Sequence, residues 1–278
     1  MHRGIAQVAL AAVLWGTWSL YLRPTGLPGT VTAPIVLVVI GATGLVLIRG
    51  DRAPARWDRT SWLLLVAYAV LDAINAGTFF GAMQVTTVAV AVLTHCTAPV
   101  LVALLAPRID GVRVPGSLVA AMVALAGLVL LLRPWASLSG DLAAGAVLGG
   151  ASAIAYASLV FVGRALAARI GVGRATAYHA LLAAPLFLPF VIPELHRIEA
   201  IDLAWLSGGA LLNGTLATWL FLDALGRIGS ARAAVLTFLE PTVAVLVGWI
   251  AFGEALEVGA LAGGVLVLGA GLYVSVSQ

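Results

Sequence analysis

The chain has 278 residues, of which 62% are hydrophobic and only 10% are charged. A typical soluble domain carries about 25% charged and about 45–50% apolar residues, so this composition excludes a water-soluble protein and indicates an integral membrane protein. The net charge is +3, and all fifteen basic residues are arginines in short tracts between apolar runs. That placement favours membrane topology over nucleic-acid binding as the reason for the basic balance.

Ten apolar runs follow one another along the chain, and each is long enough to cross a bilayer as a helix. They cover residues 5–22, 31–48, 61–82, 87–106, 115–132, 142–163, 175–193, 203–225, 231–252 and 257–276. The first run ends without a small-residue cleavage site, so we interpret it as a helix and not as a signal peptide. The sequence therefore predicts an all-α membrane protein with ten transmembrane helices, and with loops such as residues 49–54 and 107–111 between them.

The arginines predict the orientation of these helices. If the N-terminus is cytoplasmic, the outer segments hold only Arg23, Arg133 and Arg197. The inner segments then hold twelve arginines: Arg3, Arg49, Arg52, Arg56, Arg59, Arg108, Arg113, Arg164, Arg169, Arg174, Arg227 and Arg232. Because positive charge concentrates on the cytoplasmic side, we expect both termini inside, in the cytoplasmic (inner) membrane. Tryptophans near the run ends fit interfacial anchors, namely Trp57, Trp62, Trp135, Trp205 and Trp249.

The chain also contains an internal repeat. The tetrapeptide Ala-Val-Leu-Thr occurs at residues 91–94 and 234–237, and a proline follows each copy, Pro99 and Pro241, 142 residues apart. The same offset carries the first five runs onto the last five, which predicts two repeats, residues 1–137 and 138–278. Five is an odd number, so the second repeat is inverted in the membrane. Inverted repeats are typical of secondary transporters with a central site, although duplication also builds channels and membrane enzymes.

Short motifs add a family resemblance. Leu14-Trp15-Gly16 lies in the first run, and Leu236-Thr237-Phe238-Leu239-Glu240-Pro241, Gly248-Trp249 and Gly253-Glu254 lie in or just after the ninth. With the repeat, they resemble the signatures of EamA-type transporters of the drug/metabolite transporter superfamily across essentially the whole chain. The resemblance implies small-molecule transport, often export, through a central cavity between two five-helix halves. The first half departs from it, with Ala98 where the second half has Glu240 and Arg108-Ile109-Asp110 where Gly-Glu is expected.

Three acids lie within the apolar runs, where an ionisable group is costly and is a functional candidate by default. Asp223 stands four residues before Arg227, so an interfacial ion pair explains it. Asp72 and Glu240 have no arginine in mid-run beside them. Each therefore predicts a proton that is released during transport, or a cationic substrate. The alternative for Asp72 is a protonated acid that hydrogen-bonds a neighbouring helix.

Glu240 has a structural alternative as well. Pro241 has no backbone N–H, so the carbonyl of Thr237 is expected to lose its helical partner and the helix to kink. Glu240 would then stabilise that kink.

Further polar and aromatic residues complete the candidate site. Tyr68, Asp72, Asn75 and Phe79 recur at helical spacing, which predicts a stripe that faces protein or a water-filled cavity. His95 and His179 are each either part of the site or a hydrogen-bonded structural residue. The remaining candidates are aromatic, and they serve either packing or binding of an organic cation: Trp15, Trp18, Tyr156 and Trp219. Gly259-x-x-x-Gly263 and Gly145-x-x-x-Gly149 predict close helix packing.

We therefore predict a secondary transporter that moves small organic metabolites by alternating access, as a proton-coupled exporter. Amino acids, amines and drug-like compounds all fit, with a cationic or zwitterionic substrate favoured. The alternatives are a channel or a structural membrane protein without carrier activity. No metal, cofactor or enzyme motif occurs in the sequence, and Cys96 is the single cysteine. The expected partners are the lipid bilayer and protons but no nucleic acid, and the expected state is a monomer or a homodimer.

Overall fold

The protein is all-helical in the computed structural model, which describes residues 1–51, 55–111, 113–136 and 138–277. Arg52, one of the arginines assigned to the inner side, lies outside these residues. The α-helices in chain order are α1 (His2–Gly16), α2 (Trp18–Leu22), α3 (Gly29–Leu47), α4 (Arg59–Val85), α5 (Val88–His95), α6 (Ala98–Ile109), α7 (Ser117–Leu132), α8 (Leu142–Ile170), α9 (Val172–Ala183), α10 (Leu188–Val191), α11 (Ala200–Gly209), α12 (Ala217–Ile228), α13 (Ser230–Leu236), α14 (Leu239–Phe252) and α15 (Val258–Val276).

All ten apolar runs fold as helix, as the sequence predicts. Within the described part of the chain, nine helical stretches are long and apolar enough to cross a membrane. The remaining run, residues 203–225, consists of α11, a π-helical segment (Ala210–Leu216) and α12, with no break between them. The chain is therefore a multi-pass membrane protein.

One predicted loop is wrong. Residues 107–109 were expected between helices, but they form the last turn of α6, with Pro107 inside the helix. A proline near a helix end removes one N–H from the ladder, which costs less there than in mid-helix. The backbone N–H of Asp110 closes the turn by donating to the carbonyl of Ala106 at 2.8 Å.

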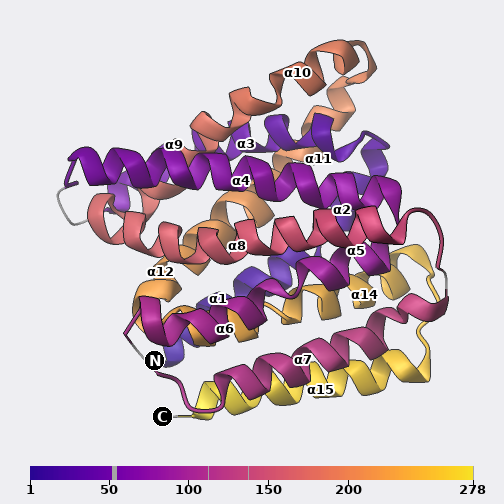
Figure 1. Ribbon diagram of the computed structural model, residues 1–278. Helices are drawn as coiled ribbons and strands as arrows, with labels where there is room; N and C mark the ends of the chain where they lie inside the picture. The colour runs from indigo at the N-terminus through magenta and orange to yellow at the C-terminus, as the bar shows by residue number, and fades with distance from the viewer. Residues whose placement is uncertain (52–54, 112, 137, 278) are drawn as a thin grey trace.

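The helices form one bundle in which successive spans run in opposite directions (Figure 1). Helix α4 packs against α8, α3 against α9, α7 against α15, and α1 against both α12 and α14. The start of α1 and the end of α15 lie at the same end of the bundle (Figure 1), as the arginine pattern requires. We call this the terminal end, and the other the distal end.

Glycines allow several of these helices to approach closely, as the two small-residue motifs predict. A Cβ added at Gly127 of α7 would lie 2.7 Å from the carbonyl oxygen of Gly263 on α15. Added at Gly145 or Gly149 of α8, it would collide with threonine side chains at the end of α4 and in α5. The contact at Gly259 is looser, with the nearest atom 3.7 Å away.

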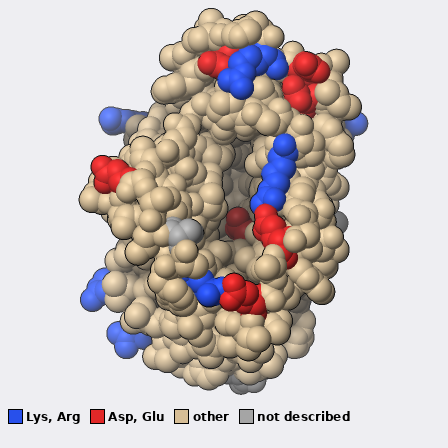
Figure 2. Space-filling model, turned by 90° about the vertical axis from the view of Figure 1, so that its right-hand side faces the viewer, with Lys and Arg blue, Asp and Glu red and all other residues tan. Residues whose placement is uncertain are grey.

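The distal end of the molecule is hollowed. Figure 2 looks onto this face and shows a deep depression at its centre, with arginines and acids around it and an acidic side chain in its depth. Most of the surface between these charged residues is formed by uncharged ones (Figure 2).

Candidate functional site

Asp72 on α4 and His179 on α9 face each other. The His179 Nε2 atom lies 3.6 Å from Asp72 Oδ2, and the imidazole is buried while a quarter (25%) of the Asp72 side chain is exposed. His179 Nδ1 donates a hydrogen bond to the carbonyl of Ala175, at 2.8 Å, and the ring of Tyr68 lies 4.5 Å from the imidazole. The sequence offers no arginine beside Asp72; the structure brings an imidazole to it from a helix in the other half of the chain.

A second polar contact joins three helices. Ser152 on α8 lies 2.9 Å from Asn75 Oδ1 and 3.1 Å from the Asn75 carbonyl oxygen on α4, and 2.8 Å from His95 Nδ1 on α5. The serine has one hydrogen, which the Asn75 oxygens take, so His95 Nδ1 donates to the hydroxyl and leaves Nε2 as an acceptor. The rings of Phe79 and Tyr156 lie 4.7 and 5.3 Å from the His95 ring.

Every member of the Tyr68 to Phe79 stripe thus meets α5, α8 or α9, so the stripe faces protein, as the sequence predicts. Ser152 escaped prediction. A serine in a helix rich in alanine and glycine has the pattern of a small packing residue, and nothing in its spacing marks the contact.

Glu240 lies where two helices meet end to end. Helix α13 stops at Leu236 and α14 starts at Leu239. As expected, the Thr237 carbonyl has lost its regular helical partner at Pro241 and the helix is interrupted; the Glu240 N–H donates to that carbonyl instead, at 2.9 Å in a tighter turn. Within the described residues, the Glu240 carboxylate has no hydrogen-bond or ion-pair partner.

The opening and closing motifs meet in space. Helix α1 crosses α14 at Gly16, where an added Cβ would lie 2.7 Å from the Glu240 carbonyl oxygen and 2.6 Å from Cβ of Val243. Only a glycine permits this approach, which explains why Trp-Gly and Glu-Pro belong to one structural unit.

The other aromatic candidates do not gather around one acid. Trp15 packs edge-on against Phe221, with the ring centroids 5.2 Å apart. Trp18 lies against Gly209 of α11, and Trp219 packs on the central hydrophobic cluster. Each of the three is partly exposed, so part of each side chain remains accessible after packing.

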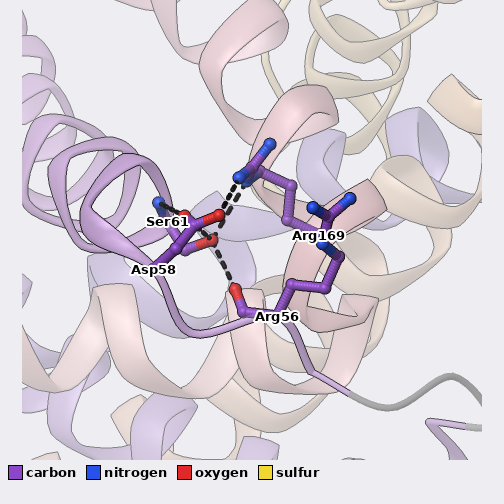
Figure 3. A network of polar contacts seen from close by, with 4 residues as sticks. All are labelled: Arg56, Asp58, Ser61 and Arg169. Atoms are coloured by element: carbon purple, nitrogen blue, oxygen red, sulfur yellow. Dashed lines mark hydrogen bonds and ion pairs between the residues drawn. The ribbon is translucent and has the colours of Figure 1, made fainter.

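Ion pairs hold the terminal end together. Figure 3 shows one network there: Asp58 accepts a hydrogen bond from the Ser61 backbone N–H at 2.9 Å and pairs with Arg169, whose Nε donates to the Ser61 hydroxyl at 3.0 Å. The Ser61 hydroxyl also reaches the carbonyl of Arg56 (Figure 3). The backbone N–H of Ser61, with the Arg169 guanidinium, holds the pKa of Asp58 below its usual value.

Two other acids at this end are almost fully buried. Asp110 pairs with Arg164 at 2.5 Å and accepts the Ser230 backbone N–H at 3.0 Å, with 5% of its side chain exposed. Asp51 likewise accepts backbone N–H groups at the start of α9.

The pair expected between Asp223 and Arg227 is confirmed at 2.9 Å. The Asp223 carboxylate also accepts a hydrogen bond from the side-chain amide of Gln7 at 2.7 Å.

The distal end is held by exposed pairs. Arg23 and Glu254 lie 2.7 Å apart with half of each side chain exposed, and Arg23 also covers the ring of Phe252. Arg133 pairs with Glu257 in the same region.

Comparisons with known proteins place these features in a family. A model described as the EamA-like transporter family matches residues 143–276. A protein of Archaeoglobus fulgidus, named an uncharacterized transporter, is 30% identical over 269 residues, which is 96% of this chain and 94% of that protein. A solved crystal structure has the same fold, with a TM-score of 0.80 and 21% identity over 98% of this chain and 97% of the other.

Proposed function

The chain belongs to the EamA-like transporter family, and from that premise we propose that it exports small organic metabolites across the cytoplasmic membrane in exchange for protons. A transporter family implies a small-molecule substrate and a place in the bilayer, and its members are generally not enzymes. The proposed substrates are amino acids, amines or drug-like compounds that are cationic or zwitterionic. Both termini are proposed to be cytoplasmic, on the arginine pattern.

Two observations support the proposal of inverted repeats, residues 1–137 and 138–278, whose last residues lie outside the described ones. The helix break between α5 and α6 and the break between α13 and α14 lie one repeat offset apart, within a residue. Also, the third span of each half packs on the first span of the other, α4 on α8 and α12 on α1. Broken helices at corresponding positions of two halves are a pointer to a transporter binding site.

Unpartnered Glu240 at one of these breaks carries the proposal. A carboxylate without a partner inside a membrane protein is costly, and binding a proton or a cationic substrate removes that cost. We place the substrate path in the distal hollow and assign to it Asp72, Asn75, His95, His179, Glu240, Trp15, Trp18, Tyr156 and Trp219. None of these residues is an arginine, which favours a positively charged group on the substrate.

The ion pairs support alternating access. The repeat offset carries Arg23 to a position next to Arg164, and Asp110 to two positions before Glu254, so the pairs are repeat-related. The pair at the terminal end is buried and the pair at the distal end is exposed. This asymmetry fits a state that is open distally and closed at the terminal end.

Flux through purified protein in liposomes tests the proposal. We expect saturable counterflow of at least one compound from a panel of amino acids and amines, with net uptake driven by a pH gradient. Glu240→Gln should lose the saturable counterflow of cationic compounds, because its carboxylate is proposed to hold the positive group of the substrate, whereas Glu194→Gln, at a partly exposed acid paired with Arg197, should retain it. Absence of saturable flux for the whole panel, or single-channel currents in its place, would contradict a carrier.

A further inference from the structure

The contact between Asp72 and His179 joins the two proposed repeats. Helix α4 belongs to the first half and α9 to the second, and the two side chains stand 3.6 Å apart where these helices pack. A change in the relative position of the halves changes this distance directly.

The hydrogen positions on His179 follow from its other contact. A backbone carbonyl can only accept, so the nitrogen 2.8 Å from the Ala175 oxygen, Nδ1, carries a hydrogen. The second nitrogen, Nε2, is the one that faces the Asp72 carboxylate. Nδ1 therefore always carries its hydrogen, and only the hydrogen on Nε2 can be gained or lost.

The arrangement favours one further proton. Without it, the Nε2 lone pair faces a negatively charged oxygen in a mostly buried setting, which is repulsive. With it, the pair is either imidazolium and carboxylate or imidazole and carboxylic acid, and both are attractive. The distance of 3.6 Å exceeds that of a direct hydrogen bond, so the two side chains face each other closely without being hydrogen-bonded.

Among the described residues, no other charge lies where it could take this role. Helix α9 packs against α3, α4, α8, α12 and the 3-10 segments Ile48–Gly50 and Ala184–Phe187. Helix α4 also packs against α5. Besides the pair, the ionisable residues on α9, α4 and the elements packed against them are Arg49, Arg59, Tyr68, His95, Tyr156, Arg164, Arg169, Arg174, Tyr178, Asp223 and Arg227. Four of the arginines are already paired with acids at the terminal end, and Arg49 and Arg59 lie at helix ends there. Of the others, Tyr68 contacts the imidazole with its ring.

We propose that Asp72 and His179 together hold one exchangeable proton, bound while α4 and α9 are in contact and released when the halves separate. The pair is then the element that links proton movement to the conformational change. This inference rests on the proposed function, and it assigns the coupling proton to two residues that act as one site. Asp72 alone does not hold it.

Nitrogen NMR on histidine-labelled protein tests the proton itself. The chain has four histidines, so single substitutions assign each signal. At neutral pH we expect His179 to carry hydrogen on Nδ1, with Nε2 protonated or hydrogen-bonded. In Asp72→Ala, which removes both the charge and any hydrogen-bond donor, Nε2 should become an ordinary bare nitrogen. A bare Nε2 in both proteins, or a hydrogen on Nε2 with none on Nδ1, would overturn the inference, and neither result depends on transport.

Flux tests the coupling, with phenylalanine and 2-phenylethylamine as probes and a trapped pH-sensitive dye. For one proton per substrate, a gradient of one pH unit drives about tenfold accumulation. Asp72→Asn, His179→Gln and the double variant should each lose this accumulation, and the double variant should lose no more than either single one. His196→Gln, an exposed histidine, is the control.

The NMR and flux experiments distinguish failure of the coupling pair from failure of the proposed carrier function. Retained accumulation in Asp72→Asn or His179→Gln would overturn the pair as the coupling element but leave the carrier intact. Failure of the wider panel in wild-type protein would overturn the carrier, while NMR still decides whether the pair holds a proton.

Discussion

The buried ion pair between Asp110 and Arg164 predicts a large effect from a small substitution, Asp110→Asn. The Asp110 carboxylate bonds the Arg164 guanidinium at 2.5 Å and the first backbone N–H of α13, that of Ser230, at 3.0 Å. Asparagine keeps an oxygen for Ser230 but removes the negative charge. The half-buried guanidinium of Arg164 is then left without its negatively charged partner.

The cost follows from burial. Removing one partner of a fully buried pair costs about 3–5 kcal/mol. Here 5% of the Asp110 side chain is exposed but 29% of Arg164, so water compensates part of the loss. Loss of the favourable contact between the carboxylate and the α13 N-terminus adds about 0.3–1 kcal/mol. We therefore expect a loss of about 2–3 kcal/mol in the free energy of unfolding.

A double-mutant cycle measures this. Asp110→Asn, Arg164→Gln and the double variant are unfolded in detergent, and we expect a coupling energy of about 1 kcal/mol or more. The control is Arg227→Gln, since its pair with Asp223 is an i,i+4 surface contact worth about 0.3–0.5 kcal/mol. Additive effects of the two Asp110–Arg164 substitutions, or a loss no larger than the control's, would refute the reasoning.

Three other predictions concern stability. Asp58→Asn should lower the unfolding temperature at neutral pH. The pKa of Asp58 in the folded protein is lowered, mainly by the Ser61 backbone N–H that its carboxylate accepts. The stabilisation is therefore present above about pH 4 and disappears as the pH falls through the pKa of the folded protein. A penalty that does not shrink in acid would contradict this. Gly127→Ala should cost about 1–3 kcal/mol, because the new Cβ would lie 2.7 Å from the Gly263 carbonyl oxygen, whereas Gly269→Ala meets no atom within 4 Å and serves as the control; equal unfolding temperatures would show that the helices shift freely. Ser152→Ala, at a fully buried hydroxyl joining α4, α5 and α8, should cost about 1–3 kcal/mol in chemical denaturation, and an unchanged midpoint would mean that the hydroxyl carries no net stability.

Local features of the sequence are sufficient for the helices and for the common end of the two termini. A run of about 20 apolar residues lowers its free energy by entering the bilayer whatever its neighbours are, and arginines resist crossing it. The prediction failed where local rules compete, as at Pro107, which a helix end tolerates.

The partners of the polar residues were decided by tertiary structure. Asp72 has no arginine near it in the sequence, and Asp110 has Arg108 and Arg113 nearby, yet the structure pairs the two acids with His179 and Arg164 from the other half of the chain. Which side chains meet depends on how each helix is rotated about its axis and where it crosses its neighbours. Packing sets both, through contacts such as Gly16 on α14. The sequence by itself determined that Asp72 and Glu240 are costly in a membrane; only the folded bundle determined that Asp72 has an imidazole beside it and Glu240 has no partner among the described residues.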